Sequence, residues 1–263
     1  MKTVKSADGT LIAYEKTGEG PPLVLVHGGT TDHTSWKLVL PTLAKHFTVY
    51  AIDRRGRGKS GDSSDYRLEL EFEDVTAVVD MIDEPAILLG HSSGGLISLE
   101  TALRAENLSK LILNEPTIIP KEDEKLNTAL EEIIVKLESV LRERGNEEAL
   151  EFFLENLQKI SPDIIESLRK TSWSAMVNEI PTLPRELKAM KDHKFDAARF
   201  KDLAVPAMLI HGSESLPRQK NAINILHKTL PESTIMELEG QSHFALITAP
   251  DLFAEKVINF ARE

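Results

Sequence analysis

The strongest chemical signal in the sequence is the segment Gly90-His91-Ser92-Ser93-Gly94. It follows the apolar run 86–89, which predicts a buried strand, and it opens a helical pattern of leucines. A serine on a sharp strand-to-helix turn between small residues is typical of a nucleophile elbow, which exposes the hydroxyl at the end of a sheet. The helix N-terminus would also favour developing negative charge there. We therefore predict that Ser92 is a nucleophile. The alternative is a glycine- and serine-rich turn that matches by coincidence.

A serine hydroxyl is a weak nucleophile and needs a base that takes its proton; His243 is the predicted base. It lies in the segment 240–244, after the stretch 234–238 that predicts the last strand. In chain order the histidine of such an arrangement comes late, after the serine and the acid. His91 is expected to point away from the Ser92 hydroxyl. Four other histidines fall in predicted helices or loops and are expected to be solvated: His33, His46, His193 and His227.

A second glycine-rich segment, His27-Gly28-Gly29, follows the apolar run 23–26. Acyl transfer to a serine requires N–H groups directed at the negatively charged oxygen of the tetrahedral intermediate. We expect one from Ser93, the residue after the nucleophile, and one from Gly29 in this loop. We also expect His27 and Gly28 to contact the substrate. The alternative is a tight glycine turn in which the His27 ring only packs.

Strand and helix patterns alternate through much of the chain, which predicts a parallel sheet covered by helices. Buried strands are predicted at 23–26, 47–52 and 86–89, and further strands at 111–113, 207–210 and 234–238. Before them, residues 2–6 and 11–16 flank an Asp-Gly pair and predict a hairpin. Helices are predicted at 36–45, 69–82 and 251–262.

Residues 116–200 differ from the rest because they are charged, helix-forming and poor in strand signals. Helices are predicted at 122–144 and 147–159, a third starts at Ser161-Pro162, and a short one follows Pro181 and Pro184. We interpret the block as an insertion over the carboxyl ends of the strands, where open α/β sheets bind ligands. We expect Trp173 to contact the substrate. The apolar residues of the block that could line a pocket are Phe152, Phe153, Trp173 and Met176.

The segment 53–62, Asp-Arg-Arg-Gly-Arg-Gly-Lys-Ser-Gly-Asp, is similar to the Asp-Arg-x-Gly-x-Gly-x-Ser segment of the α/β-hydrolase superfamily. With the other motifs and their order, the resemblance covers the chain except the inserted helices. It implies an α/β-hydrolase fold, with a mostly parallel central sheet flanked by helices and an inserted helical cap. Residues 1–116 and 200–263 would form the core, and 117–199 the cap. We interpret the segment 53–62 itself as a structural turn after a strand.

One departure from the family pattern concerns the acid of a Ser-His-acid triad. Many members carry this acid after the seventh strand as Gly-x-x-Asp, but here Ser215 occupies that position. Two glutamates could replace it. Glu115 follows the sixth strand, where some relatives carry the acid, and Glu214 lies one residue before Ser215. We predict Glu115 and keep Glu214 as the alternative.

Composition restricts the partners of the chain. Its 263 residues carry a net charge of −11, which disfavours nonspecific binding to nucleic acid or an anionic membrane. There is no cysteine, no apolar leader and no apolar stretch of about 18 residues, so we expect a cytoplasmic protein. No metal is expected, because His-Glu-x-x-His and metal-spaced carboxylates are missing. The Gly-Lys-Ser at 58–60 lacks a glycine that a phosphate loop requires.

These observations predict a serine hydrolase that cleaves a small ester, or a related carbonyl compound, through an acyl-enzyme and without a cofactor. Two alternatives stay open. The same fold and triad can run non-hydrolytic or carbon–carbon bond-cleaving chemistry, and a small-molecule binding protein can retain the triad.

Overall fold

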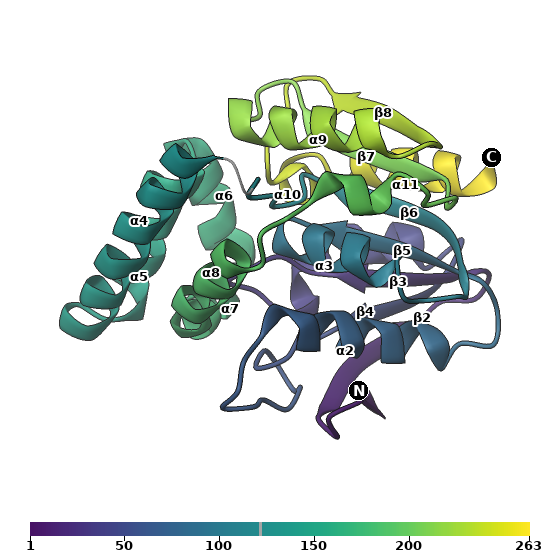
Figure 1. Cartoon of the computed structure of the whole chain (residues 1–263), viewed down its shortest axis with the longest axis horizontal. Helices are drawn as coiled ribbons and strands as arrows, with labels where there is room; N and C mark the ends of the chain where they lie inside the picture. The colour runs from purple at the N-terminus through teal and green to yellow at the C-terminus, as the bar shows by residue number, and fades with distance from the viewer. Residues whose placement is uncertain (121–122) are drawn as a thin grey trace.

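The fold is a mostly parallel sheet with helices on both faces (Figure 1). The computed structural model describes residues 1–120 and 123–263. Within them the strands are β1 (Lys2–Lys5), β2 (Leu11–Thr17), β3 (Pro22–Val26), β4 (Thr48–Ile52), β5 (Ala86–His91), β6 (Leu108–Asn114), β7 (Ala207–Gly212) and β8 (Ser233–Leu238). Their order is β1-β2-β4-β3-β5-β6-β7-β8, with β2 antiparallel to β1 and β4 and the remaining neighbours parallel. The predicted hairpin and fold class are confirmed.

The helices of the described ranges fall into two groups. Those that flank the sheet are α1 (Leu40–Leu43), α2 (Leu68–Asp80), α3 (Ser93–Thr101), α9 (Pro217–Thr229), α10 (Ala245–Thr248), α11 (Pro250–Arg262) and the turn η1 (His33–Trp36). Those between β6 and β7 are α4 (Glu124–Glu143), α5 (Asn146–Phe153), η2 (Leu154–Gln158), α6 (Pro162–Thr171), α7 (Trp173–Glu179), η3 (Ile180–Thr182), α8 (Leu183–Asp192) and η4 (Ala197–Phe200). We call the second group the cap. None of these helices combines the length and hydropathy needed to cross a bilayer.

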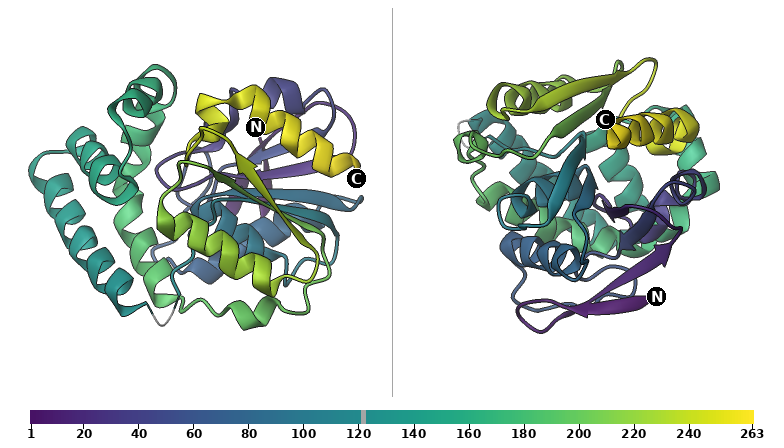
Figure 2. Two further views of the ribbon diagram at one scale, coloured as in Figure 1. Left: turned by 90° about the horizontal axis from the view of Figure 1, so that it is seen from above. Right: turned by 90° about the vertical axis from the view of Figure 1, so that its right-hand side faces the viewer.

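Side chains alternate between the two faces of the sheet, and because helices cover both faces, the central strands β3, β5 and β7 are buried on each. In β3, Val24 and Val26 pack with helices α2, α3 and α9, whereas Leu23 and Leu25 pack with η1, α1 and α11. All four side chains are fully buried. Figure 2 (left) shows α9 and α11 on opposite sides of the sheet. The unbroken apolar runs of the sequence thus reflect strands that have no solvent face.

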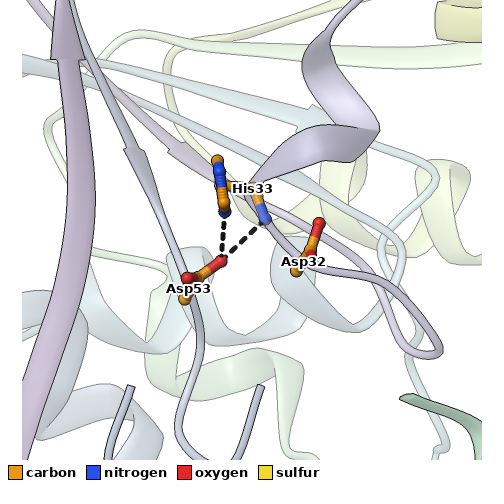
Figure 3. Close-up of side chains that lie close together, drawn as sticks. All are labelled: Asp32, His33 and Asp53. Carbon is orange, nitrogen blue, oxygen red and sulfur yellow. Dashed lines mark hydrogen bonds and ion pairs between the residues drawn. The ribbon is translucent and has the colours of Figure 1, made fainter. Parts of the chain in front are cut away.

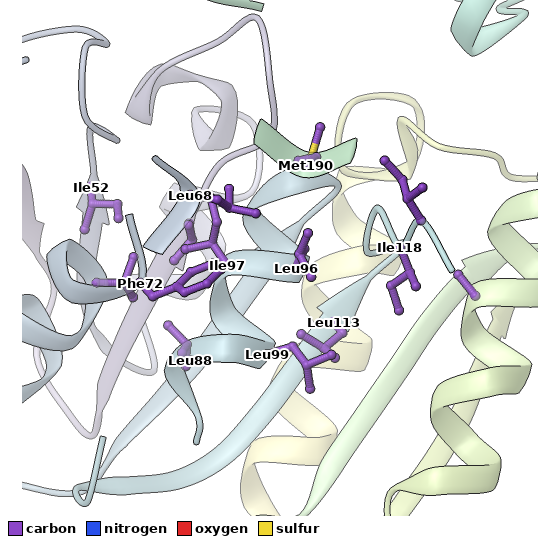
Figure 4. Close-up of a cluster of buried hydrophobic side chains, with 14 of the residues drawn as sticks. Ile52, Leu68, Phe72, Leu88, Leu96, Ile97, Leu99, Leu113, Ile118 and Met190 are labelled. Atoms are coloured by element: carbon purple, nitrogen blue, oxygen red, sulfur yellow. The ribbon is translucent and has the colours of Figure 1, made fainter. Parts of the chain in front are cut away.

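The cap covers the carboxyl ends of β5 and β6 and shares the core of the sheet. One cluster of buried side chains runs from Leu88 and Leu113 in the strands through Leu96 of α3 to Met190 of α8 (Figure 4). The cap leaves and re-enters the core at one place, since Pro120 forms an isolated parallel bridge with Phe195. The inserted helical cap that the sequence predicted is therefore present as part of the fold.

Three predicted helices differ in detail from the structure. The helix predicted at 36–45 is broken into η1 and the short α1, because Pro41 stands in the first turn of α1 and the chain bends before it. The helix predicted at 147–159 ends its α-helical part at Phe153 and continues as the wider turn η2. The helix predicted at 122–144 is α4, although residue 122 itself lies outside the described residues. Helix α9 was not predicted; Pro217 in its first turn is the signal that could have indicated it.

Candidate active site

Ser92 lies on a sharp turn between β5 and α3. Its φ of 57° and ψ of −123° are a conformation that a residue with a side chain rarely adopts, and such strain is concentrated at functional sites. The turn requires glycine on both sides of it, because there is no room for a side chain at Gly90 or Gly94. A Cβ on Gly90 would lie 2.3 Å from the carbonyl oxygen of Gly94, and one on Gly94 would lie 2.3 Å from that of Val26. Any larger residue at these two positions would push strand and helix apart.

Glu115 follows β6 by one residue and is almost completely buried, at 1% exposure. One carboxylate oxygen, Oε2, lies 2.7 Å from Nδ1 of His243. The other, Oε1, accepts a hydrogen bond from the Gly212 N–H at 3.1 Å and one from the Ser215 hydroxyl. Burial alone would raise the pKa of Glu115, but the hydrogen bonds from His243, Ser215 and Gly212 outweigh it and hold the pKa below its usual value. The carboxylate is therefore ionised beside the imidazole.

The ionised Glu115 favours the His243 tautomer that carries its hydrogen on Nδ1, because Nδ1 can then donate to the carboxylate. In that tautomer Nε2 has a free lone pair. The amide nitrogen of Gln219 also lies 2.9 Å from Nδ1, while its amide oxygen accepts from the Leu216 N–H. His91 supports the same ring from behind, with its Nε2–H donating to the His243 carbonyl oxygen at 2.9 Å. Burial lowers the pKa of His91 to about 3, so that ring is neutral.

Ser92 and His243 both line the same cavity, together with Glu115. The Ser92 Oγ lies 3.3 Å from the hydroxyl oxygen of Thr117. The Thr117 N–H in turn donates to the Ser92 carbonyl oxygen at 3.0 Å. No hydrogen bond joins Ser92 to His243 in the described part of the chain; such bonds often tighten only in the substrate complex. The structure thus brings the predicted serine, histidine and acid together around one cavity.

Gly29 and Ser93, the predicted oxyanion-hole residues, line this cavity as well. Ser93 is the first residue of α3, where backbone N–H groups have no partner within the helix. Among the described residues, no hydrogen bond takes up the N–H of Gly29 or of Ser93. Gly28 also lines the cavity, and a Cβ added to it would lie 3.1 Å from the Ser92 Cβ. The loop after β3 therefore passes directly beside Ser92.

The cavity has a volume of about 110 Å³ and lies between the core and the cap. Its wall is mainly apolar, and the cap supplies much of it. The apolar lining residues of the cap are Leu126, Leu130, Phe153, Leu157, Met176, Leu183, Leu187 and Met190. Two of the four pocket candidates from the sequence, Phe153 and Met176, are thus in place.

Three residues that the sequence singled out lie elsewhere. His27 is fully buried behind the site, where its Nε2 accepts from the Arg54 N–H and its Nδ1 is 2.8 Å from the Gly28 carbonyl oxygen. Trp173 is partly buried within the cap, with its ring N–H donating to Glu147 at 2.9 Å. Neither lines the cavity, so we do not carry their substrate contacts forward. The alternative acid, Glu214, is exposed and does not contact His243.

Two histidines expected to be solvated are not. The side chain of His193 is only 6% exposed, and its Nε2 lies 2.9 Å from Glu100 of α3. His33 is also largely buried, and its Nδ1 lies 2.6 Å from the carboxylate of Asp53. Both residues lie in a loop or at a helix end, where exposure was expected, but a buried carboxylate binds each imidazole and keeps it in the interior. His46 is partly exposed and His227 is exposed.

A buried group of charges on the other side of Ser92 was not predicted. Glu186 of the cap helix α8 is fully buried and bridges two arginines of the segment after β4. Its Oε1 accepts from Arg54 at 2.7 Å, and its Oε2 accepts from Arg57. Arg54 also donates two hydrogen bonds to Glu71 of α2, both at 2.7 Å. We call Arg54, Arg57, Glu71 and Glu186 the cap–core charge cluster.

The cluster reaches the predicted oxyanion hole. Arg54 donates to the Ser93 hydroxyl oxygen at 2.9 Å. A Cβ on Gly29 would lie 3.5 Å from Glu186 Oε2. Burial would raise the pKa of Glu186, but the two guanidinium groups lower it to about 2. The segment 53–62, which we had interpreted as a structural turn, therefore also supplies the arginines that bind the cap.

One group of three side chains has the geometry of a metal site, namely Asp32, His33 and Asp53 (Figure 3). Three of its four carboxylate oxygens already accept hydrogen bonds from the described residues. Asp53 Oδ1 accepts from the backbone N–H of His33 and its Oδ2 from that of Lys59, while Asp32 Oδ1 accepts from the Thr34 N–H. These bonds fix the loops after β3 and β4, and we assign the group to the scaffold.

The comparisons with known proteins agree with this architecture. The model of the Alpha/beta hydrolase family matches residues 23–256. A pimeloyl-[acyl-carrier protein] methyl ester esterase of Nitrosospira multiformis is 24% identical over 258 residues, which cover 94% of this chain and 97% of that one. A solved α/β hydrolase of Sphaerobacter thermophilus is 31% identical, with a TM-score of 0.82 over 98% and 99% of the two chains. An esterase structure from Rhodococcus sp. ECU1013 is 24% identical, with a TM-score of 0.80 over 98% and 97%.

Proposed function

Because the chain belongs to the α/β hydrolase family, we propose that it is a carboxylesterase-like serine hydrolase of small esters. Ser92 is the nucleophile, His243 the general base and acid, and Glu115 the group that orients His243. The backbone N–H groups of Gly29 and Ser93 stabilise the oxyanion. The observation that carries the proposal is the buried 2.7 Å contact of Glu115 with His243 at the wall of the cavity that Ser92 lines.

The proposed reaction has two halves. Ser92 Oγ bonds to the carbonyl carbon of the ester while its proton moves to Nε2 of His243, and the carbonyl oxygen becomes an oxyanion. The intermediate collapses when the carbon–oxygen bond to the alcohol breaks, and Nε2 gives its proton to that alcohol. Water then attacks the acyl-enzyme, and its proton passes through Nε2 to Ser92 as the acid leaves. The balance is one ester and one water to one acid and one alcohol.

Electrostatics around Ser92 support this sequence of steps. Glu115 is ionised and faces Nδ1, so it stabilises the imidazolium that forms after each proton transfer. The N–H groups of Gly29 and Ser93 have no other partner among the described residues, and both residues line the cavity beside Ser92. A single oxyanion-hole donor contributes about 10²–10³ in kcat. The apolar cap residues would keep water away from the reacting atoms. The esterase names of similar proteins are consistent with an ester as substrate.

The proposal is tested by turnover of an activated short-chain ester together with labelling by an activated phosphonate. We expect many equivalents of product per chain and a phosphonate adduct at Ser92, located by peptide mass mapping. A small-molecule binding protein that retains the triad would release at most one equivalent. Stoichiometric labelling at another residue with Ser92 free would overturn the assignment.

A further inference from the structure

Three residues with a full charge line the cavity among the described residues: Glu115, Glu186 and Arg218. The two carboxylates are paired, Glu115 with His243 and Glu186 with Arg54 and Arg57. Arg218 differs from both. No carboxylate of the described residues lies within ion-pair distance of its guanidinium. The cavity therefore contains one cation whose charge nothing in the described chain directly neutralises.

Arg218 stands in the first turn of α9, and its side chain bridges the core to the cap. Its Nη2 donates to the amide oxygen of Gln158 at 3.1 Å, and within residues 1–120 and 123–263 the guanidinium makes no other hydrogen bond. A guanidinium has five N–H donors, so most of them remain available. Burial lowers the pKa of Arg218, with the more distant charge of Glu115 acting in the opposite direction. A partly buried cation without a paired acid is costly unless a ligand completes it.

The rest of the wall defines the ligand that this cation could take. The cavity that Arg218 lines is bounded largely by apolar groups, among them Ala222 of α9 and Leu126 and Leu157 of the cap. The nucleophile lines the same cavity. A ligand that satisfies both features has an ester carbonyl at one end, an apolar chain, and one negative charge at the other end. A carboxylate suits a single guanidinium because its two oxygens match the planar N–H fork.

We propose that Arg218 binds the free carboxylate of a half-ester of a dicarboxylic acid, so that the substrates are anionic esters. This inference rests on the proposed function, since it takes Ser92 as the atom that the ester end must reach. Gln158 is a positioning residue that holds the guanidinium at the rim of the cavity. Cleavage by the steps above would release the alcohol and a dicarboxylate.

The kinetic test compares two substrates that differ only in charge: the monomethyl ester of a straight-chain dicarboxylic acid and the methyl ester of the monocarboxylic acid of equal length. The measured quantity is the ratio of their kcat/KM values. We expect Arg218→Gln to lower this ratio about 10- to 100-fold, the size of a charge-assisted hydrogen bond. Arg218→Lys keeps the positive charge but lacks the planar pair of N–H donors. We therefore expect its ratio of kcat/KM values to lie between those of the unmodified protein and the Arg218→Gln variant.

The matched control is Lys228→Gln, which removes the same charge from an exposed position of α9 outside the cavity wall. It should keep the ratio of the unmodified protein. An equal ratio in the Arg218→Gln and Lys228→Gln variants would overturn the proposal, because the preference would then come from overall charge or from chain length.

A binding test separates this proposal from the proposed function. In the Ser92→Ala variant, calorimetry measures the Kd of the half-ester and of its neutral counterpart without any turnover. Tighter binding of the half-ester that is lost on adding Arg218→Gln supports the anion site, even if Ser92 proves not to be the nucleophile. Equal binding of the two esters, or binding of neither, overturns the site and leaves esterase activity to be judged by the labelling experiment alone.

Discussion

Two buried carboxylates flank Ser92, and they differ in the groups that surround them. Glu115 lies on the core side and receives hydrogen bonds from an imidazole, a hydroxyl and a backbone N–H. Glu186 lies on the cap side and is bound by the guanidinium groups of Arg54 and Arg57. Imidazole can gain or lose a proton near neutral pH, whereas a guanidinium in a protein does not.

Under the proposed function, this difference separates a group that takes part in the reaction from one that fixes the geometry of the site. In the resting state the Glu115 carboxylate faces a neutral imidazole, which compensates its negative charge only partly. When His243 becomes an imidazolium, the two side chains form an ion pair. The charge of Glu186 is balanced at all times, so its environment does not change during a reaction. We expect that changes at Glu115 act mainly on kcat and that changes at Glu186 act mainly on stability.

The largest effect should come from the partner of Glu115. We expect His243→Ala to lower kcat by about 10⁴ or more, since loss of a triad member removes proton transfer entirely. Steady-state turnover of an activated ester measures this, with His227→Ala as the control at an exposed histidine of α9. Near-normal turnover in the His243 variant would move the base to another residue.

Removal of the Glu115 charge should have the next largest effect. Glu115→Gln keeps the shape of the side chain but no longer favours the hydrogen on Nδ1 of His243, so we expect kcat to fall by about 10²–10⁴. The variant must be compared with the unmodified protein at equal unfolding midpoints, because Glu115 is buried. A fall in stability without a fall in kcat would place Glu115 in the same class as Glu186.

The corresponding change on the cap side should act on folding. Glu186→Gln leaves the buried Arg57 guanidinium without a carboxylate and leaves Arg54 with Glu71 alone, so we expect a loss of about 3–5 kcal/mol in unfolding free energy. Urea denaturation measures it. Adding Arg57→Gln should cost less than the sum of the two single changes, because the orphaned charge is then removed. If the losses in unfolding free energy of the two single variants added up to that of the double variant, Glu186 and Arg57 would not be coupled energetically.

The two sides also differ in how far the sequence predicted them. Ser92, Glu115 and His243 each follow a predicted strand, and the carboxyl ends of parallel strands meet at one edge. Their proximity could therefore be predicted without a structure. Glu186 lies in a charged helix of the cap, where a carboxylate is normally solvated. Its burial depends on how the cap packs, which helical periodicity does not encode. Three arginines in the segment 54–57 were the available signal, because buried guanidinium groups require carboxylates.

Acid should weaken the folded state before it affects either carboxylate. The pKa of His91 is lowered to about 3 from an ordinary 6.5, so its neutral form stabilises the fold fully above pH 6.5 and progressively less as the pH falls toward 3. The slope is about 1.4 kcal/mol per pH unit for one such group. Urea denaturation between pH 7 and 5, with His91→Asn as comparison, should show it. An equal slope in both proteins would mean that His91 is not the source.

The smallest effect is expected at the alternative acid. Glu214 is exposed and adjacent to Ser215, which donates to Glu115 instead of replacing it. Glu214→Gln should therefore change kcat by less than about tenfold, the threshold at which an effect equals 1.4 kcal/mol. If Glu214→Gln lowered kcat strongly and Glu115→Gln did not, the acid would be Glu214 and our assignment would be wrong.

The bridge between Pro120 and Phe195 makes the cap a transplantable unit. A segment whose two ends already touch can be exchanged for a longer or shorter one at little entropic cost, about 0.6 kcal/mol for each doubling of length. The graft has one electrostatic condition. Arg54 and Arg57 stay behind in the recipient core, and an incoming block without an acidic side chain opposite them would bury unmatched positive charge. Chimaeras that supply this acid should accept quite different helices around it, and with them different cavity walls.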